Sequence, residues 1–132
     1  MEILILTLLE NSEIIKSDSS ISEKYEKDLL DSALDYIEIY YKNGTLKEFS
    51  TIKGQRAYFI SRILKKYTDH NFKELIQEKK LERAAYLLLK TKLSIEAILS
   101  AIGYRNSSFF YRKFKERYKV SPKNYRKNNK KS

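Results

Sequence analysis

The segment SIEAILSAIGYRNSSFFYRKFK, residues 94–115, decides the expected fold, because it has the pattern of two short helices joined by a tight turn. In its first half, apolar residues recur at i, i+3, i+4 and i+7, which makes one helical face apolar. Ser94 is placed to cap this helix through its hydroxyl. Gly103 is expected to end it, because a residue without a Cβ atom adopts the left-handed conformation at low cost. Asn106 or Ser107 then caps the second helix.

The second helix of this segment carries two different faces. Phe110 and Phe114 lie on an apolar side. A helix whose other side presents hydrogen-bonding and cationic groups can enter the major groove of duplex DNA, where an arginine donates two hydrogen bonds to a guanine edge. Such a stripe occurs here at i, i+3, i+4 and i+7 and indicates a recognition helix; it consists of Ser108, Tyr111, Arg112 and Lys115.

Charge is unevenly distributed along the 132 residues. Residues 1–50 contain 11 acidic and 5 basic residues, and residues 51–132 contain 6 acidic and 22 basic residues, so that net charges of −6 and +16 make up the total of +10. A local excess of this size indicates a polyanionic partner, with nucleic acid as the first choice and an acidic membrane as the second. The alternative is a basic surface that is only solvated.

The composition argues against several kinds of site. The chain has no cysteine, which excludes disulfides and thiolate chemistry, and His70 is its single histidine, so neither a metal site nor a cofactor is expected. Glu74 and Glu78 share a helical face, but no nucleophile–base pair accompanies them, so an enzyme is not expected. The apolar run at residues 3–9 is too short to span a bilayer and lacks a basic flank, so we expect an intracellular protein without a membrane partner.

The N-terminal residues differ in composition from the rest of the chain. Residues 1–13 are predicted to form a short helix, and residues 11–23 (NSEIIKSDSSISE) are serine-rich and polar, which is typical of a linker. Residues 1–23 are therefore predicted to be a remnant helix and linker from a preceding domain, followed by a DNA-binding domain at residues 24–132. The alternative is a short tail that folds back on the helical domain.

One proline and three glycines leave few breaks in the chain, which favours an all-helical domain. Thr45 with Glu48, and Asn71 with Glu74, have the spacing of a capping box. A helix over residues 71–92 would measure about 30 Å, close to one turn of DNA. Its polar middle, residues 77–80, is expected to be exposed. The other expected helices cover residues 24–42, residues 45–54 and residues 57–67, and a last one starts at Ser121-Pro122.

The chain contains an internal repeat. At an offset of 49 residues, Thr45 matches Ser94 and Gly54 matches Gly103; one residue is then added in the second turn, and the offset becomes 50. Chance amphipathicity accounts for matching core positions, but not for paired arginines and lysines. The polar stripe also repeats at this offset, with Tyr58, Ser61, Arg62 and Lys65 in the first copy.

With these features the chain resembles the AraC/XylS family of bacterial transcription regulators over about residues 35–126. The family pattern near the C-terminus is roughly S-I-x-E-I-A-x-x-x-G-F, then S-Y-F-x-R-x-F-K, then S-P-x-x-Y-R. The residues that carry the resemblance here are Arg83-Ala84, Ser94-Ile95, Gly103-Tyr104, Ser108, Phe110, Arg112, Phe114-Lys115, Ser121-Pro122 and Tyr125-Arg126.

The resemblance implies an all-α fold of seven helices, a homeodomain-like bundle in which a long linker helix joins two helix-turn-helix subdomains. It implies recognition helices at about residues 57–66 and 107–117, in successive major grooves of double-stranded DNA. It further implies a sequence-specific transcription regulator of the bacterial cytoplasm, associated with the nucleoid. RNA polymerase is an implied candidate partner, and an effector or dimerisation domain is expected to lie outside this chain.

Within the two stripes, the residue types indicate separate roles. Arginines are candidates for base contacts, because the guanidinium fork matches a guanine edge, and lysines for phosphate contacts, which position a protein without reading sequence. Serines can read bases directly or through water, and tyrosines can contact a thymine methyl group or a sugar, or pack on their own helix pair. The predicted DNA-binding residues are Tyr58, Ser61, Arg62, Lys65, Ser107, Ser108, Tyr111, Arg112 and Lys115; weaker candidates for phosphate contacts are Lys66, Arg105, Lys113, Lys123 and Arg126.

Several positions depart from the family pattern. Leu99 stands where a smaller alanine is usual, so the two helices of its unit are expected to pack farther apart. Lys53 replaces an apolar residue before Gly54. Asp69 and Lys119 stand where a glycine commonly follows each recognition helix. We therefore expect the second unit to follow the family geometry more closely than the first.

The alternative function is a basic helical module that binds RNA or a protein partner without reading DNA sequence. Such a module predicts exposed aromatic residues on a flat surface, rather than arginine and lysine repeated on two helices. A preference for duplex DNA over structured RNA separates the two hypotheses.

Overall fold

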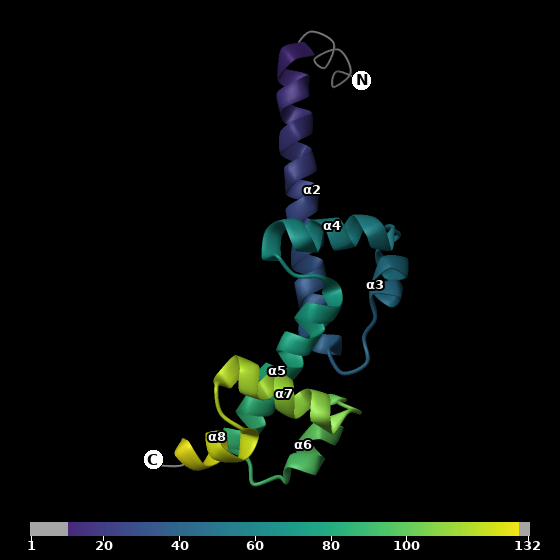
Figure 1. Cartoon of the computed structure of the whole chain (residues 1–132). Helices are drawn as coiled ribbons and strands as arrows, with labels where there is room; N and C mark the ends of the chain where they lie inside the picture. The colour runs from purple at the N-terminus through teal and green to yellow at the C-terminus, as the bar shows by residue number, and fades with distance from the viewer. Residues whose placement is uncertain (1–10, 130–132) are drawn as a thin grey trace.

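The structure, a computed structural model, describes residues 11–129. These residues form seven α-helices and no β-strand, which confirms the all-α fold expected from the sequence. In Figure 1 the helices form an elongated arrangement, from which the long helix α2 projects at one end. The helices are α2 (Asn11–Tyr40), α3 (Leu46–Lys53), α4 (Ala57–Thr68), α5 (Phe72–Lys90), α6 (Ile95–Ile102), α7 (Ser107–Tyr118) and α8 (Pro122–Asn128).

Two apolar cores divide the molecule into two units that share α5. Unit 1 consists of α2, α3, α4 and the first half of α5; unit 2 consists of the second half of α5 with α6, α7 and α8 (Figure 1). Aromatic and aliphatic side chains fill both cores, and their burial is the main favourable term in folding. The most deeply buried large side chains are Phe49, Ile60 and Leu64 in unit 1, and Ile98, Ile102, Phe110 and Phe114 in unit 2.

The internal repeat is visible in the way that the first helix of each helix-turn-helix begins and ends. Thr45 and Ser94 each accept a hydrogen bond from the backbone amide three residues later, at 3.0 and 3.1 Å. Gly54 and Gly103 each end their helix in the left-handed region, with φ of 65° and 82°. The residue after each glycine then donates to the carbonyl five residues back, which completes the same helix end in both units: Gln55 to Ser50 and Tyr104 to Leu99.

The second helices of the two units also end alike. Asp69 and Lys119 are the non-glycine residues with positive φ among the described residues, at 67° and 71°. Each donates from its backbone amide to the carbonyl four residues back. Asn71 and Ser121 then cap the following helices, and Asn71 forms the predicted reciprocal capping box with Glu74. Core, helix ends and most caps therefore repeat at the offsets read from the sequence; the exception is the start of α4, where Arg56 makes no side-chain cap while Asn106 caps α7.

The prediction of a linker at residues 11–23 is wrong, because these residues are the first part of α2. The segment Asn11–Tyr40 contains no proline or glycine, so its serines are not enough to interrupt the helix. The helix expected over residues 1–13 lies, for residues 1–10, outside the described residues. Whether residues 1–23 come from a preceding domain remains a prediction.

The capping box predicted at Thr45 and Glu48 forms only in part. Thr45 accepts from the Glu48 amide, but the Glu48 carboxylate does not return to the Thr45 amide. Instead, the buried Tyr36 of α2 accepts from that amide at 3.1 Å and donates from its hydroxyl to Glu48. A side chain from another helix therefore replaces the local partner and ties α3 to α2.

The polar middle of α5 is not exposed as predicted. Gln77, Glu78, Lys79 and Lys80 are all half-buried, because elements from both units pack around this turn. The long helix itself runs over Phe72–Lys90, two residues short of the predicted C-terminal end. The middle of α5 is therefore a contact region between the two units.

Candidate nucleic-acid interface

In unit 1, α4 presents the predicted stripe while its opposite side fills the core. Tyr58 is 73% exposed, and Arg62 and Lys65 are also exposed. Ser61 is half-buried, beside the first residues of α3 and α5. The structure thus brings three of the four stripe residues to the surface, and places Ser61 in the groove between three helices.

In unit 2, α7 presents a fuller version of the same stripe. Asn106 caps α7 by accepting from the Phe109 amide at 3.0 Å, so the cap role falls to Asn106 and not to Ser107. Phe110 and Phe114 are completely buried and hold α7 on the unit 2 core. All the predicted DNA-binding residues of this helix are exposed: Ser107, Ser108, Tyr111, Arg112 and Lys115.

Each stripe arginine lies against an aromatic ring of its own helix. The guanidinium carbon of Arg62 is 5.9 Å from the centre of the Tyr58 ring, and that of Arg112 is 5.2 Å from the centre of the Phe109 ring. Neither arginine forms an ion pair within the described part of the chain. A cation–π contact of this kind limits the motion of the guanidinium, and without an ion pair its donors stay available to a ligand.

The basic residues differ in what they contact inside the chain. Lys66 donates to Glu26 of α2 at 2.8 Å, and Lys113 pairs with Glu116 at 3.5 Å. Arg126 is half-buried and donates to the carbonyl oxygens of residues 88 and 91, at the C-terminal end of α5. These three side chains therefore already have partners within the fold.

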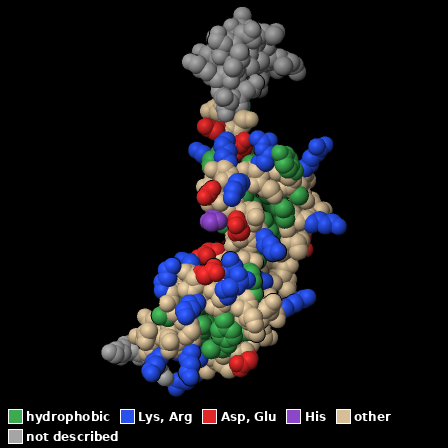
Figure 2. All heavy atoms as spheres, viewed as in Figure 1, with side chains coloured by type: hydrophobic (Ala, Val, Ile, Leu, Met, Phe, Trp, Pro, Cys, Tyr) green, Lys and Arg blue, Asp and Glu red, His purple; other side chains and the backbone are tan. Residues whose placement is uncertain are grey.

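The other predicted basic contacts are more available to solvent. Lys65 donates only to the backbone carbonyl of Asp69, at 3.0 Å. Lys115, Arg105 and Lys123 are exposed and form no ion pair among residues 11–129. Figure 2 shows lysine and arginine side chains on both units of the molecule.

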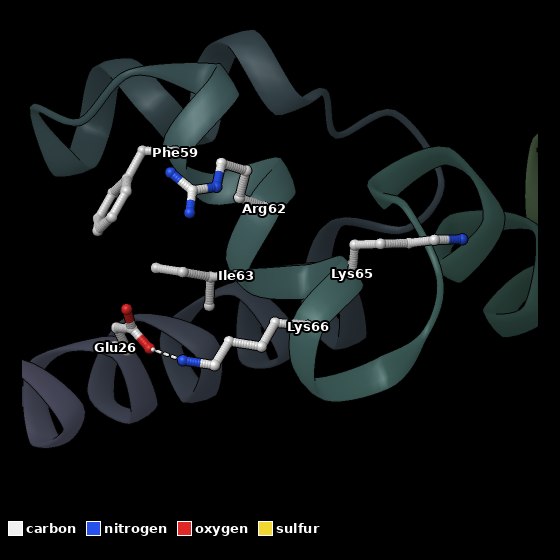
Figure 3. A pocket seen from close by; sticks show the side chains of 6 residues that line it. All are labelled: Glu26, Phe59, Arg62, Ile63, Lys65 and Lys66. Carbon is white, nitrogen blue, oxygen red and sulfur yellow. Dashed lines mark hydrogen bonds and ion pairs between the residues drawn. The ribbon is translucent and has the colours of Figure 1, made fainter.

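The basic residues of α4 point in different directions around a pocket between α2 and α4. Figure 3 shows the Lys66 side chain turned toward Glu26, the Arg62 guanidinium turned toward Phe59, and Lys65 directed away from both. Hydrogen bonds from Lys66 and then from Tyr67 hold the pKa of the Glu26 carboxyl below its ordinary value. Lys66 therefore contributes to the contact between α2 and α4.

Sequence reasoning missed Lys73, which is exposed and lines the same groove as Ser61. The groove also contains the N-terminal residues of α3 and α5. The repeat could have found this residue, because Lys73 matches Lys123 at the offset of 50.

Other kinds of site find little support in the described residues. Among residues 11–129, no three histidine, cysteine, aspartate or glutamate side chains gather as metal ligands. No helix in this part of the chain combines the length and the apolar character needed to cross a membrane. Two helix-turn-helix units, each with an exposed basic second helix, define instead a bipartite DNA-binding domain.

Comparisons with known proteins support this class. A family model described as "Helix-turn-helix domain" matches residues 56–128, and the chain belongs to this family, in its AraC-type form. The C-terminal domain of AraT, a response regulator from Geobacillus stearothermophilus, superimposes with a TM-score of 0.71 at 29% identity, over 79% of this chain and 88% of that one.

Curated regulators are also similar. The chain is 32% identical over 105 residues to the xylose operon regulatory protein of Escherichia coli K12. This alignment covers 76% of this chain and 27% of that protein. It is 35% identical over 69 residues to the Msm operon regulatory protein of Streptococcus mutans, over 52% of this chain and 25% of that protein. The chain therefore spans about a quarter of these relatives.

These findings confirm the resemblance to the AraC/XylS family and the double helix-turn-helix fold. The family consists of sequence-specific DNA-binding transcription regulators and is not a family of enzymes. The assignment of individual residues to bases or phosphates stays a prediction.

Proposed function

We propose that α4 and α7 enter two successive major grooves on one face of duplex DNA. The observation that carries this proposal is the exposed stripe, which occurs on the second helix of both units and includes an arginine and a lysine at matching positions. The shared helix α5 has 19 residues, or about 28 Å at about 1.5 Å per residue, so it can set the units about one DNA turn apart.

We assign separate roles to the residues of the two stripes. Arg62 and Arg112 read guanine edges, because each guanidinium lies near an aromatic ring of its own helix and forms no ion pair in the described chain. Lys65 and Lys115 contact phosphates next to the bases read by their helices. The remaining stripe residues complete the two base-reading surfaces: Tyr58, Ser61, Ser107, Ser108 and Tyr111.

Backbone contacts flank these surfaces. Arg105, Lys73 and Lys123 are exposed and are the stronger candidates for phosphates. Lys66, Lys113 and Arg126 are weaker ones, because phosphate binding would compete with the partners that they already have. Contacts of this kind fix the register of a protein on DNA without reading its sequence.

The complete protein is proposed to be a larger bacterial regulator. The chain covers about a quarter of its curated relatives, which is consistent with an effector or dimerisation domain outside these residues. We propose that it acts in the cytoplasm on nucleoid DNA, with RNA polymerase as a further partner.

A selection from random duplexes of about 30 base pairs, at near-physiological salt, tests the proposed function. Two enriched motifs about 10–11 base pairs apart are expected if both helices read successive grooves. A single motif would limit unit 1 to backbone contacts. Absence of enrichment despite salt-sensitive binding, or stronger binding to structured RNA than to duplex DNA, would favour the basic module instead.

A further inference from the structure

One turn in the middle of α5 contacts both units through consecutive side chains. Lys79 forms an ion pair with Glu38 of α2 at 2.5 Å, and its side chain is only 17% exposed. The next residue, Lys80, donates from Nζ to the carbonyl oxygen of Gly103 in the turn of unit 2, at 3.0 Å. Glu78, one residue earlier, accepts from Arg117 of α7 at 2.6 Å. The turn therefore holds α2, the α6–α7 turn and α7 at the same time.

The two units also touch directly at this place. A Cβ atom built on Gly103 would lie 2.8 Å from the carbonyl oxygen of Lys42, so the turn of unit 2 rests on the backbone that follows α2. The neighbouring Tyr41 packs against the cores of both units. Figure 1 shows the end of α2 beside α5, next to the helices of unit 2. The contact therefore involves backbone, apolar and ionic groups.

The ammonium group of Lys80 lies in an environment that restrains it. It sits 5.4 Å from the centre of the Tyr104 ring, in the same turn as its carbonyl acceptor. Partial burial lowers the pKa of Lys80 below its ordinary value. A half-buried ammonium needs a fixed polar partner, and here the partner is the backbone of the other half of the domain.

We propose that this junction, defined as Glu38, Lys42, Lys79, Lys80 and Gly103, fixes the separation and rotation of α4 relative to α7 and thereby makes DNA recognition selective for half-site spacing. This inference rests on the proposed function, because it requires both helices to read DNA. One inserted base pair shifts a half-site by about 3.4 Å and rotates it by about 35°. Two helices held rigidly cannot follow that change, whereas two loosely connected units can.

Lys79→Met together with Lys80→Met tests the junction. Methionine keeps the helical propensity and much of the side-chain volume, but removes both polar contacts. Affinity is measured for duplexes with the selected spacing, with one base pair inserted or deleted, and with one half-site only. We expect the wild type to lose about tenfold or more in affinity per base-pair change, and the variant to lose about threefold or less.

Lys90→Met together with Lys92→Met is the matched control. It removes the same charge from exposed positions at the end of α5 and after it, away from the junction. Any change in its affinity should be the same factor for every spacing, because neither residue lies at the junction. Only the ratio of affinities between duplexes of different spacing therefore reports on the junction.

A distance measurement gives a second readout. The chain has no cysteine, so Lys53→Cys and Glu96→Cys allow one spin label on an exposed position of each unit. We expect the distance distribution between the labels to broaden when the junction variant is compared with the wild type. If the double variant does not fold, Glu38→Gln, at an exposed residue, removes only the ion pair between Lys79 and α2.

The outcomes separate the two proposals. Two results would overturn the proposed role of the junction. One is a folded junction variant that keeps the wild-type ratio of affinities between spacings and the narrow distance distribution. The other is a wild type that binds both half-sites equally well at any spacing. A wild type that shows no sequence preference for single half-sites would instead overturn the proposed function, whatever the junction does.

Discussion

At the scale of single residues, Arg112 is the proposed base-reading residue whose substitution tests DNA-sequence recognition most directly. Its guanidinium lies over the Phe109 ring and forms no ion pair among the described residues. We expect Arg112→Ala to weaken binding to the preferred site by about 1–3 kcal/mol and to relax the base preference at one position. A selection repeated with the variant measures this preference.

The matched control for this prediction is Lys113→Ala, since Lys113 is adjacent, carries the same charge and lies over the same Phe109 ring. It should lower the affinity without altering the base preference. An unchanged preference profile in Arg112→Ala would remove that arginine from base reading and make it a backbone contact.

Glu26 illustrates a charged residue that acts within the fold. Hydrogen bonds from Lys66 and Tyr67 hold its pKa below the ordinary value of 4.5. A carboxyl group whose pKa is lower in the folded state stabilises the fold above its unfolded pKa, and this contribution is lost as pH falls through the folded pKa. We therefore expect Glu26→Gln to lower the free energy of unfolding near neutral pH, and the difference from wild type to shrink as pH falls below about 4.5.

Urea unfolding at several pH values measures this difference. Glu96→Gln is the control, because Glu96 is exposed and forms no ion pair in the described part of the chain. A difference for Glu26→Gln that stays constant across the acidic range would show that the carboxylate charge does not stabilise the contact between α2 and α4.

At the scale of the helices, the ends of α4 and α7 are determined by residues in the left-handed conformation. Lys119 adopts φ of 71°, where a side chain with a Cβ atom is strained by about 1–2 kcal/mol. Because glycine removes the strain but increases the freedom of the unfolded chain, we expect Lys119→Gly to stabilise the protein by about 0.5–1 kcal/mol. Thermal or urea unfolding measures the change.

Asp69 provides the comparison for this prediction. It has nearly the same conformation, with φ of 67°, but aspartate tolerates the left-handed region better than lysine. Asp69→Gly should therefore stabilise the fold less than Lys119→Gly. A destabilising Lys119→Gly would contradict the prediction. It would mean that the Lys119 side chain contributes more to stability than the strain of its backbone costs.

At the scale of the whole molecule, the segment with the largest positive charge also carries both recognition helices. Residues 51–132 hold 22 of the 27 basic residues, and neutralising about 6–8 phosphates would give a log–log salt slope of roughly −5 to −7. We expect Lys115→Ala to weaken all DNA sequences about equally and to make this slope shallower by about one unit. Binding titrations over a range of salt concentrations measure both effects.

The exposed Lys90, at the end of α5, serves as the control for Lys115, and Lys90→Ala should leave the slope nearly unchanged. Loss of discrimination between sequences in Lys115→Ala would contradict the phosphate assignment and make Lys115 a base contact.

The sequence by itself determined the helices, the turns and their repetition. Ser94, Gly103 and Asn71 act through hydrogen bonds to residues only three to five positions away, so local spacing was enough to predict them. The apolar periodicity likewise identified Phe110 and Phe114 as core, and the offset of 50 located both polar stripes, of which only Ser61 is half-buried. The linker expected at residues 11–23 failed because polar serines without proline or glycine do not stop a helix.

Only the tertiary structure decided which polar side chains have hydrogen-bond partners within the fold and how the two units contact each other. The hydroxyl of Tyr36 replaced the local cap partner of Thr45, Lys66 turned to Glu26, and Arg126 turned to the end of α5, across sequence separations of 9, 40 and 35–38 residues. Lys79 and Lys80 look like solvated residues in a polar stretch, yet they hold the two units together. Such partners depend on how helices pack in space, and no pattern of nearby residues encodes them.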